Sequence, residues 1–349
     1  MKNNAYYLGA IAALTETLET RGMSDLELLQ HNPTTLCSTF KGRRNGEACI
    51  AKAYNMTLGG GGVDTARTIM RMEQAWNDEV AVITKASELS RKMYPDQETL
   101  FPTILDHFHS KSDEWGDMFV TVMSFLEVPS LAQFLEENKA PLSIDQTSAL
   151  LRGGARCLHV LSEIGIIHRD LKPQNILFDG KRAAIIDFNL SRPEGVSVMT
   201  MIDPDQWWCY PLDASKIRPN PNIDIYALGF IAICALLGKT PLEIIDLSDG
   251  TGECFLDTTS PNLRIPKSLR PILEKMTARN PNDRYDSPEI LLEALDIAPT
   301  KAIEQKTTPA APSATRPGSR FGLISVDGKL MEVRYEPDGK INSTSALII

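Results

Sequence analysis

Four polar side chains in one short stretch have the types and spacing that phosphoryl transfer requires. Asp170 and Lys172 are close neighbours, Asn175 follows directly, and Asp187 comes next within Ile186-Asp187-Phe188. The Asp170 carboxylate can accept a proton from a hydroxyl group, and the Lys172 ammonium can neutralise a moving phosphate. Asn175 and Asp187 offer oxygen ligands, which Mg²⁺ prefers. The pattern therefore predicts a magnesium-dependent phosphoryl-transfer site.

The composition narrows the class of protein. The chain has 349 residues, of which 42% are hydrophobic and 23% charged, as in an ordinary globular protein. Its formal net charge of -9 argues against nucleic-acid binding and against attachment to an anionic membrane. The six cysteines are scattered without metal-type spacing, which favours free thiols in a reducing compartment. We therefore expect a cytoplasmic protein with no nucleic-acid or membrane partner.

Two apolar runs are interpreted as helices rather than as membrane signals. Residues 5–14 lead into a stretch rich in Thr and Glu without a small-residue cleavage site, so an amphipathic N-terminal helix is favoured over a signal peptide. Residues 225–238 are too few to span a bilayer. Their length suits a helix that is buried on every side inside a large domain.

Periodicity divides the remainder into a β-rich part, a helical part and a tail. Residues 34–42 and 47–54 are β-prone runs that predict a hairpin, and residues 104–109 and 118–127 predict two further strands. Residues 64–93 have helical periodicity, and from Ser130 onward the pattern is mostly helical. One face of that first long helix is expected to carry Ile69, Met72, Trp76, Val80 and Ile83.

The tail has a different composition from the rest of the chain. Residues 299–320 are rich in Pro, Ala, Thr and Ser and are interpreted as a flexible linker. Residues 321–349 contain two Asp-Gly turn signals, which predict one or two small hairpins. The expected parts are an N-terminal helical extension at 1–26, a β-rich lobe at 27–124, a helical lobe at 125–298, the linker at 299–320 and the hairpin tail at 321–349.

The catalytic run resembles a known family. His168 to Leu177, followed by Ile186-Asp187-Phe188-Asn189, is similar to the catalytic loop and metal-binding turn of the eukaryotic-like Ser/Thr protein kinases. Asp224 resembles the aspartate of a central helix that holds the catalytic-loop backbone, and Arg284 resembles a late arginine that pairs with an activation-segment acid, here Asp213. The resemblance runs from about residue 27 to 297. It implies an α+β bilobal fold, with a small β-rich N-lobe, a large helical C-lobe and ATP between them.

The resemblance also implies roles for individual residues. Lys52, within Ala48-Cys49-Ile50-Ala51-Lys52, looks like the lysine that holds the α- and β-phosphates, and Glu79 is its expected partner, with Glu73 as the rival. Residues 120–127 resemble the strand and hinge that hold adenine. The implied catalytic residues are Asp170, Lys172 and Lys52, the Mg²⁺ ligands are Asn175 and Asp187, and the residues around ATP are Lys52, Glu79, Met123, Ser124, Leu126 and Ile50.

The sequence departs from the family pattern around the nucleotide. The loop that should cover the phosphates, near residues 30–35, contains no glycine and includes Pro33, which lacks an N–H. A glycine cluster at 59–62 follows Lys52, where it is misplaced for this task. Ile50 replaces the alanine that usually roofs the adenine, and Asn189 replaces a glycine. These changes are expected to weaken nucleotide binding, but they remove none of the side chains expected to take part in catalysis.

Three functions are compatible with these residues. An active Ser/Thr protein kinase acting on protein hydroxyls is favoured, and Lys172 matches the family's serine/threonine pattern. A pseudokinase scaffold is the alternative, because of the missing glycines and Ile50. A small-molecule phosphotransferase is disfavoured by Lys172, by Asp224 and by the expected Asp213–Arg284 pair. Arg169 beside Asp170 suggests regulation by an anionic group on the activation segment. The two alternatives are phosphorylation of Ser191, Ser197 or Thr200, and permanent negative charge from Asp203 and Asp205.

Overall fold

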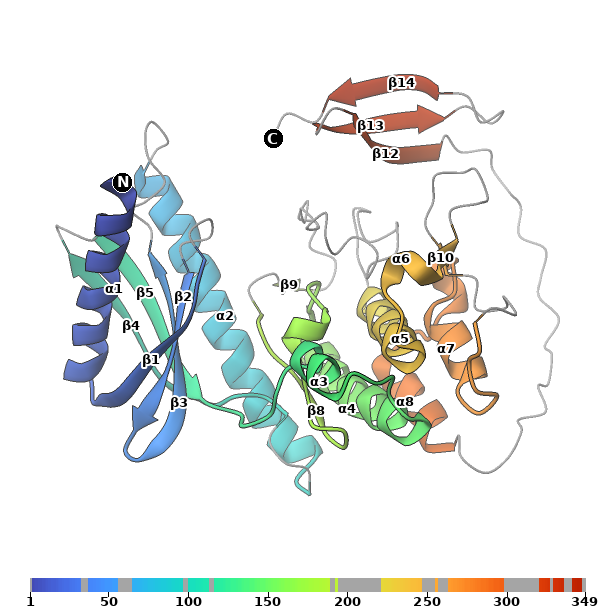
Figure 1. The fold of residues 1–349 in the computed structure, drawn as a ribbon, viewed down its shortest axis with the longest axis horizontal. Coiled ribbons are helices and arrows are strands. Elements are labelled where there is room, and N and C mark those ends of the chain that lie inside the picture. The colour runs from blue at the N-terminus through green and yellow to red at the C-terminus, as the bar shows by residue number, and fades with distance from the viewer. Residues whose placement is uncertain are drawn as a thin grey trace.

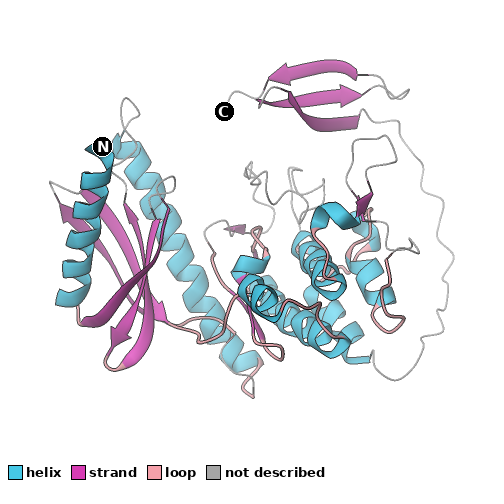
Figure 2. Ribbon diagram, viewed as in Figure 1, coloured by secondary structure: helices cyan, strands magenta, loops and turns pink. Residues whose placement is uncertain are grey.

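A computed structural model shows two lobes of different composition, followed by a small sheet (Figure 1). Strands dominate the first lobe and helices the second (Figure 2). This is the α+β bilobal arrangement that the sequence predicts. The structure describes residues 2–32, 37–55, 65–96, 100–112, 116–188, 192–193, 221–246, 255–256, 263–297, 320–326, 329–335 and 341–346.

The N-lobe is a five-stranded antiparallel sheet with a helix on each face. The strands lie in the order β1-β2-β3-β5-β4, and α1 and α2 cover opposite sides of them (Figure 1). The elements are α1 (Lys2–Thr20), β1 (Met23–Asn32), β2 (Cys37–Arg44), β3 (Glu47–Asn55), α2 (Thr65–Met93), β4 (Ile104–Ser112) and β5 (Gly116–Ser124).

Helix α1 is joined to the sheet by a tight turn at Gly22. Gly22 has φ +83°, a conformation that glycine adopts without steric cost, and its N–H donates to the carbonyl of Glu19. The chain can therefore reverse at once, and β1 begins at Met23, before the expected lobe boundary at residue 27. Leu14 and Leu18 of α1 are buried against the sheet, so this helix is part of the N-lobe core rather than an appendage.

Helix α2 packs on the other face through the side chains that its periodicity singles out. Trp76, Val80 and Ile83 are buried, as predicted, and Ile69 and Met72 pack beside them. The register of the sheet places Lys52 of β3 opposite Thr121 of β5. Because side chains alternate along a strand, Ile50 and Lys52 lie on one face while Cys49 and Ala51 lie in the core under α1.

The C-lobe is built around α5 (Asn222–Leu237), which is buried along most of its length. This confirms the prediction of a helix buried on every side. Helix α4 (Ile144–Glu163) packs against α5, and at Gly153 an added Cβ would stand 2.7 Å from the Cβ of Ala183 in β8. The other C-lobe elements are α3 (Leu131–Asn138), β6 (Ile166–Ile167), η1 (Pro173–Asn175), β7 (Ile176–Phe178), β8 (Ala183–Ile185), β9 (Arg192–Pro193), α6 (Pro241–Ile244), β10 (Ile245–Asp246), β11 (Phe255–Leu256), α7 (Arg270–Met276), η4 (Pro281–Asp283) and α8 (Pro288–Ile297).

Local sequence signals explain where α3 and α4 begin. Each follows a serine that accepts a hydrogen bond from a backbone N–H three residues on, while the glutamine at that position bonds back to the serine N–H. These reciprocal bonds satisfy N–H groups that a helix start leaves without partners. The pairs are Ser130 with Gln133 and Ser143 with Gln146.

The tail forms a three-stranded antiparallel sheet in the order β12-β13-β14, which amounts to two consecutive hairpins. Its strands are β12 (Arg320–Val326), β13 (Lys329–Tyr335) and β14 (Ile341–Ala346). Both Asp-Gly pairs lie outside the described residues.

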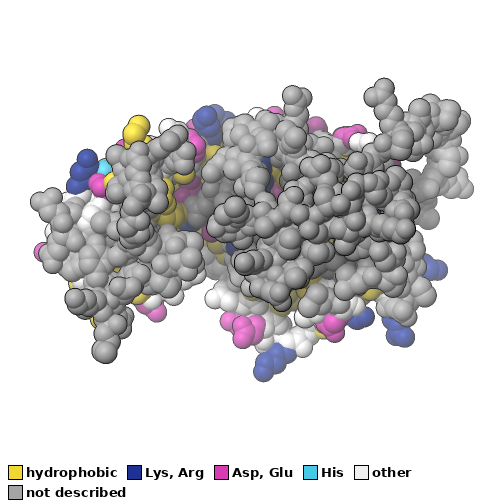
Figure 3. Space-filling view, turned by 90° about the horizontal axis from the view of Figure 1, so that it is seen from above, with side chains coloured by type: hydrophobic (Ala, Val, Ile, Leu, Met, Phe, Trp, Pro, Cys, Tyr) yellow, Lys and Arg dark blue, Asp and Glu magenta, His cyan; other side chains and the backbone are white. Residues whose placement is uncertain are grey.

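The surface carries charges of both signs (Figure 3), and the helices lack membrane-spanning character in the part of the chain that the structure describes. On the face shown in Figure 3, basic and acidic side chains both occur among the coloured residues. Across the described part of the chain, every helix is too short or too polar to cross a membrane.

Leu18 tests the contribution of α1 to the N-lobe. Its side chain is fully buried, so Leu18→Ala should lower the free energy of unfolding by about 2–4 kcal/mol through lost burial and the cavity left behind. Leu8→Ala, on the exposed side of the same helix, is the matched control and should change it by less than about 0.5 kcal/mol. Urea denaturation measures both variants. Equal stabilities would mean that α1 does not support the sheet.

Candidate functional site

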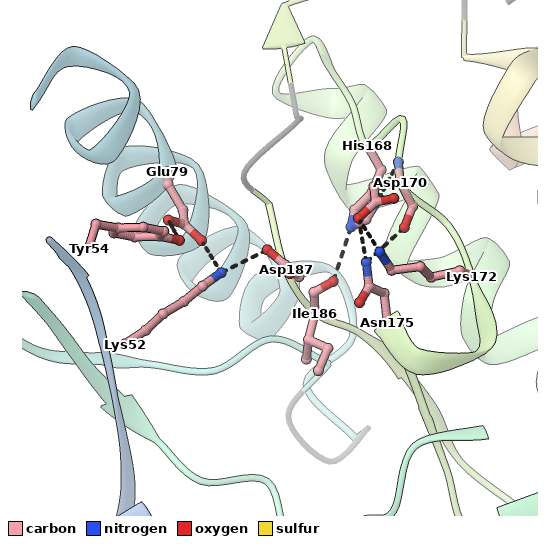
Figure 4. Close-up of polar contacts among 9 residues, drawn as sticks. All are labelled: Lys52, Tyr54, Glu79, His168, Asp170, Lys172, Asn175, Ile186 and Asp187. Carbon is pink, nitrogen blue, oxygen red and sulfur yellow. Dashed lines mark hydrogen bonds and ion pairs between the residues drawn. The ribbon is translucent and has the colours of Figure 1, made fainter. Parts of the chain in front are cut away.

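Lys52 joins the two lobes through two carboxylates. Its ammonium donates to Asp187 Oδ1 at 2.8 Å and to Glu79 Oε1 at 3.3 Å (Figure 4). Glu79 comes from α2, Lys52 from β3, and Asp187 from the segment after β8. The structure thus places Glu79, and not Glu73, beside the lysine.

The Lys52 ammonium stays charged because two carboxylates lie beside it. Burial by itself lowers the pKa of Lys52, but attraction to Asp187 and Glu79 outweighs it and holds that pKa well above the usual lysine range. Burial likewise acts to raise the pKa of Asp187, and the adjacent Lys52 ammonium reverses the effect and lowers it. For Glu79 burial prevails and its pKa is raised. The Asp187 oxygen is also the nearer of the two to the Lys52 ammonium, at 2.8 Å against 3.3 Å for Glu79.

A second polar group surrounds Asp170. The Asp170 carboxylate accepts a hydrogen bond from Asn175 Nδ2 at 2.8 Å and lies 3.1 Å from the ammonium of Lys172 (Figure 4). Asn175 Nδ2 also donates to the Asp170 carbonyl at 2.9 Å. Burial raises the pKa of Asp170, although Lys172 and Asn175 both act to lower it. Lys172 and Asn175 thus fix the orientation of the Asp170 carboxylate.

The Asp224 carboxylate holds the backbone of the loop that carries Asp170. Its two carboxylate oxygens accept the N–H groups of His168, at 2.7 Å, and of Arg169, at 3.0 Å. Asp224 lies on the buried helix α5, and burial raises its pKa despite these bonds. This is the structural role that the sequence predicted for Asp224.

His168 ties the Asp170 loop to the Asp187 turn. Its Nδ1 accepts the N–H of Asp170 at 3.2 Å, which leaves Nε2 as the donor to the carbonyl of Ile186, also at 3.2 Å. Burial lowers the pKa of His168, so the neutral ring that makes both contacts is favoured. Phe188 is buried and packs edge-on against this ring. These contacts connect the loop to the turn directly.

The expected adenine-binding residues are more dispersed. Met123 of β5 lies directly across from Ile50 of β3. Ser124 is already engaged, because its N–H donates to the Thr103 carbonyl and its hydroxyl accepts the Thr103 N–H. Leu126 lines a cavity of about 690 Å³ bounded by the hinge, α4 and the β7–β8 turn; Lys52 and Asp187 are not among its lining residues.

Asn175 and Asp187 offer oxygen atoms that suit Mg²⁺. Within the described residues there is no cluster of three or more His, Cys, Asp or Glu side chains that could hold a metal alone. Mg²⁺ is commonly bound by one or two carboxylates together with substrate phosphates and water. Asp187 and the amide oxygen of Asn175 match that chemistry, since the Asn175 amide nitrogen is turned toward Asp170. These residues fit the ion when phosphates complete its shell.

Several predicted features lie outside the described residues. These are the rest of the glycine-free loop after Asn32, the glycine cluster at 59–62, Asn189, the candidate phosphorylation sites Ser191, Ser197 and Thr200, and Asp213. Arg284, the expected partner of Asp213, is buried and donates to the carbonyls of Ala278 and Arg279. The strand β1 continues through Asn32, so the first half of the expected loop is paired with β2.

Sequence reasoning missed Tyr54 and the Trp76–Thr121 pair. The Tyr54 hydroxyl donates to Glu79 Oε2 at 3.0 Å, and Trp76 Nε1 donates to Thr121 Oγ1 at 2.8 Å. The strand period was a signal for Tyr54, because it puts that residue on the Lys52 face. The partner of Trp76 carries no such signal.

Comparison with known proteins agrees with this geometry. A model of the protein kinase domain matches residues 96–294, more than half of the chain. The chain belongs to the protein kinase family. The match begins after α2, so Lys52 and Glu79 lie before it, and their pairing rests on the structure.

Relatives carry serine/threonine kinase names. The chain is 26% identical over 268 residues to serine/threonine-protein kinase D of Synechocystis sp., covering 73% of this chain and 51% of that protein. It is 24% identical over 238 residues to the probable serine/threonine-protein kinase PknB of Lactococcus lactis, covering 66% of this chain and 36% of that protein. The aligned region thus spans about a third to a half of these relatives.

Asp224 offers a test of the loop geometry. Asp224→Ala leaves two buried backbone N–H groups without their acceptor, so the free energy of unfolding should fall by about 3 kcal/mol. Asp224→Asn keeps one acceptor oxygen and should lose less. Chemical denaturation of the three proteins gives the comparison, and an alanine variant as stable as the wild type would show that these bonds are not needed.

Proposed function

We propose that this chain transfers the γ-phosphoryl group of ATP, bound with Mg²⁺, to serine or threonine hydroxyls of a protein. The observation that carries the proposal is the contact of Lys52 with both Glu79 and Asp187, beside an Asp170 held by Lys172 and Asn175. These contacts support the proposal because they bring together a carboxylate that can accept a proton, two lysines and two oxygen ligands. The names of the relatives support serine and threonine as acceptors.

The residues divide the reaction between them. Asp170 orients the acceptor hydroxyl and receives its proton as the oxygen bonds to the γ-phosphorus and the bond to ADP breaks. Lys172, 3.1 Å from Asp170, balances charge on the transferring group. Lys52 holds the α- and β-phosphates and Glu79 keeps it aimed. Asp187 and Asn175 would hold Mg²⁺, which when bound would supply charge neutralisation at the phosphate oxygens.

A pseudokinase scaffold is the alternative that the sequence left open. The glycine-free loop and Ile50 suggested it, yet neither removes Lys52, Asp170, Asn175 or Asp187 from the arrangement. The geometry supports catalysis over a scaffold role. Among the described cysteines, the free thiols of Cys37, Cys49 and Cys157 support a cytoplasmic location as part of this proposal.

Replacing the reacting carboxylates tests the chemistry. Asp170→Asn removes the proton acceptor and Asp187→Asn removes a charged Mg²⁺ ligand, so each should lower the rate of transfer about 100-fold or more. Transfer of labelled phosphate to a generic basic protein measures the rate. Asp145→Asn, the same change at an exposed position, is the control and should match the wild type. Full turnover by either site variant, with an unchanged melting temperature, would refute the assignment.

Ile50 tests nucleotide binding separately. It lies on the Lys52 face of β3 opposite Met123, where a smaller side chain would leave room for the purine. Overpacking of this kind costs about 1–3 kcal/mol, so Ile50→Ala should tighten ATP binding about tenfold. Equilibrium titration with Mg·ATP decides the matter, with Ile144→Ala at a half-exposed helix start as the control. Equal or weaker binding by the Ile50 variant would mean that this isoleucine is a fitted part of the pocket.

A further inference from the structure

Tyr54 forms a hydrogen bond to Glu79, the same carboxylate that contacts Lys52. Its hydroxyl donates to Glu79 Oε2 at 3.0 Å while Lys52 donates to Glu79 Oε1 at 3.3 Å (Figure 4). Tyr54 and Lys52 lie two residues apart on β3 and therefore face the same way. Glu79 is 4% exposed, so the other side of the carboxylate has little access to water. One strand thus engages both oxygens of a side chain on α2.

A second hydrogen bond fixes α2 one turn away. Trp76 Nε1 donates to Thr121 Oγ1 at 2.8 Å, and both side chains are buried. Trp76 precedes Glu79 by three residues, so the two share a face of the helix. Thr121 lies on β5 directly opposite Lys52. The Trp76 ring also packs on Phe119, with the ring centroids 5.3 Å apart.

These contacts constrain α2 in two ways. Two directional hydrogen bonds one turn apart prevent the helix from rotating about its axis, and the apolar contacts of Trp76 and Val80 resist its withdrawal from the sheet. A helix held only by Glu79 and Lys52 would lose its one polar contact if Lys52 moved away from Glu79 to a phosphate. Here the position of Glu79 does not depend on Lys52 alone.

We propose that Tyr54 and the Trp76–Thr121 pair are positioning residues that keep Glu79 on Lys52. The inference rests on the proposed function, because it names what aligns the phosphate-binding lysine. It implies that the N-lobe half of the site is assembled by side chains of this chain. Neither Tyr54 nor Trp76 contacts the reacting atoms; both act through Glu79.

The first test removes single polar atoms in the full-length protein. Tyr54→Phe deletes only the hydroxyl and should lower kcat about tenfold, with an unchanged KM for a generic basic protein substrate. Tyr285→Phe, a buried tyrosine in the C-lobe, is the matched control and should leave kcat unchanged. Thr121→Val should lower kcat several-fold, and Thr121→Ser, which restores the hydroxyl acceptor, should recover it. Failure of serine to rescue would overturn the role of the Trp76–Thr121 bond.

A double-mutant cycle separates positioning from general stability. If Tyr54 acts through Glu79, adding Tyr54→Phe to Glu79→Gln should change kcat by less than about twofold, because the group it positions is already altered. Additive losses in the double variant would overturn the proposal. If Tyr54→Phe acted only by destabilising the protein, its loss of kcat would be accompanied by a lower melting temperature. The Tyr285→Phe control shows how much a lost buried hydroxyl changes the melting temperature by itself.

Amide hydrogen exchange gives a readout that needs no catalysis. Tyr54→Phe and Thr121→Val should each raise exchange within α2 several-fold while exchange in α5 stays at the wild-type level. If the wild type transfers no phosphate, the proposed function fails, and exchange in α2 still decides the positioning proposal. Exchange in α2 equal to that of the wild type in both variants would contradict it.

Discussion

The contact of one lysine with two carboxylates from different parts of the chain organises this molecule. The Lys52 ammonium lies 2.8 Å from Asp187 Oδ1 of the C-lobe and 3.3 Å from Glu79 Oε1 of α2. Lys52 and Glu79 are largely buried, and taking charges out of water is costly unless each has a partner. The surrounding structure therefore has to deliver all three side chains accurately. The sheet under α1, the packing of α2 and the strand β8 can each be understood as meeting that requirement.

The C-lobe stores local strain at the same place. Arg169 and Asp187 both have φ +67°, a region that costs a non-glycine residue about 1–3 kcal/mol. The N–H of Arg169 is held by Asp224, and the carboxylate of Asp187 is held by Lys52. The buried helix α5 thus offsets the strain of the loop, and the N-lobe offsets that of the turn. Each half of the site is stabilised by the element next to it.

How much the sequence could predict depended on the range of the interaction. Asp170, Lys172 and Asn175 lie within a few residues of each other, so their spacing alone predicted that they act together. Helical periodicity placed Trp76 and Val80 on the buried face of α2, and strong hydropathy identified α5.

Contacts between distant elements were not predictable in the same way. That Tyr54 reaches Glu79 depends on the angle at which α2 crosses the sheet, and that Trp76 reaches Thr121 depends on strand register. Neither is encoded within a local window. The engagement of Ser124 by Thr103 is a third case, because it follows from how the segment before β4 folds back. The turn at Gly22 was not predicted from the sequence, and the structure shows that it folds α1 onto the sheet.

The most direct test of the central claim is Lys52→Met, compared with Lys85→Met on the exposed side of α2. Two properties are measured, namely phosphate transfer from Mg·ATP and the free energy of unfolding. We expect Lys52→Met to abolish phosphate transfer and to lower the free energy of unfolding by about 3 kcal/mol. Both losses follow because Glu79 and Asp187 are left without their shared counter-charge. Lys85→Met should retain both properties. A Lys52 variant with wild-type transfer and stability would contradict the account.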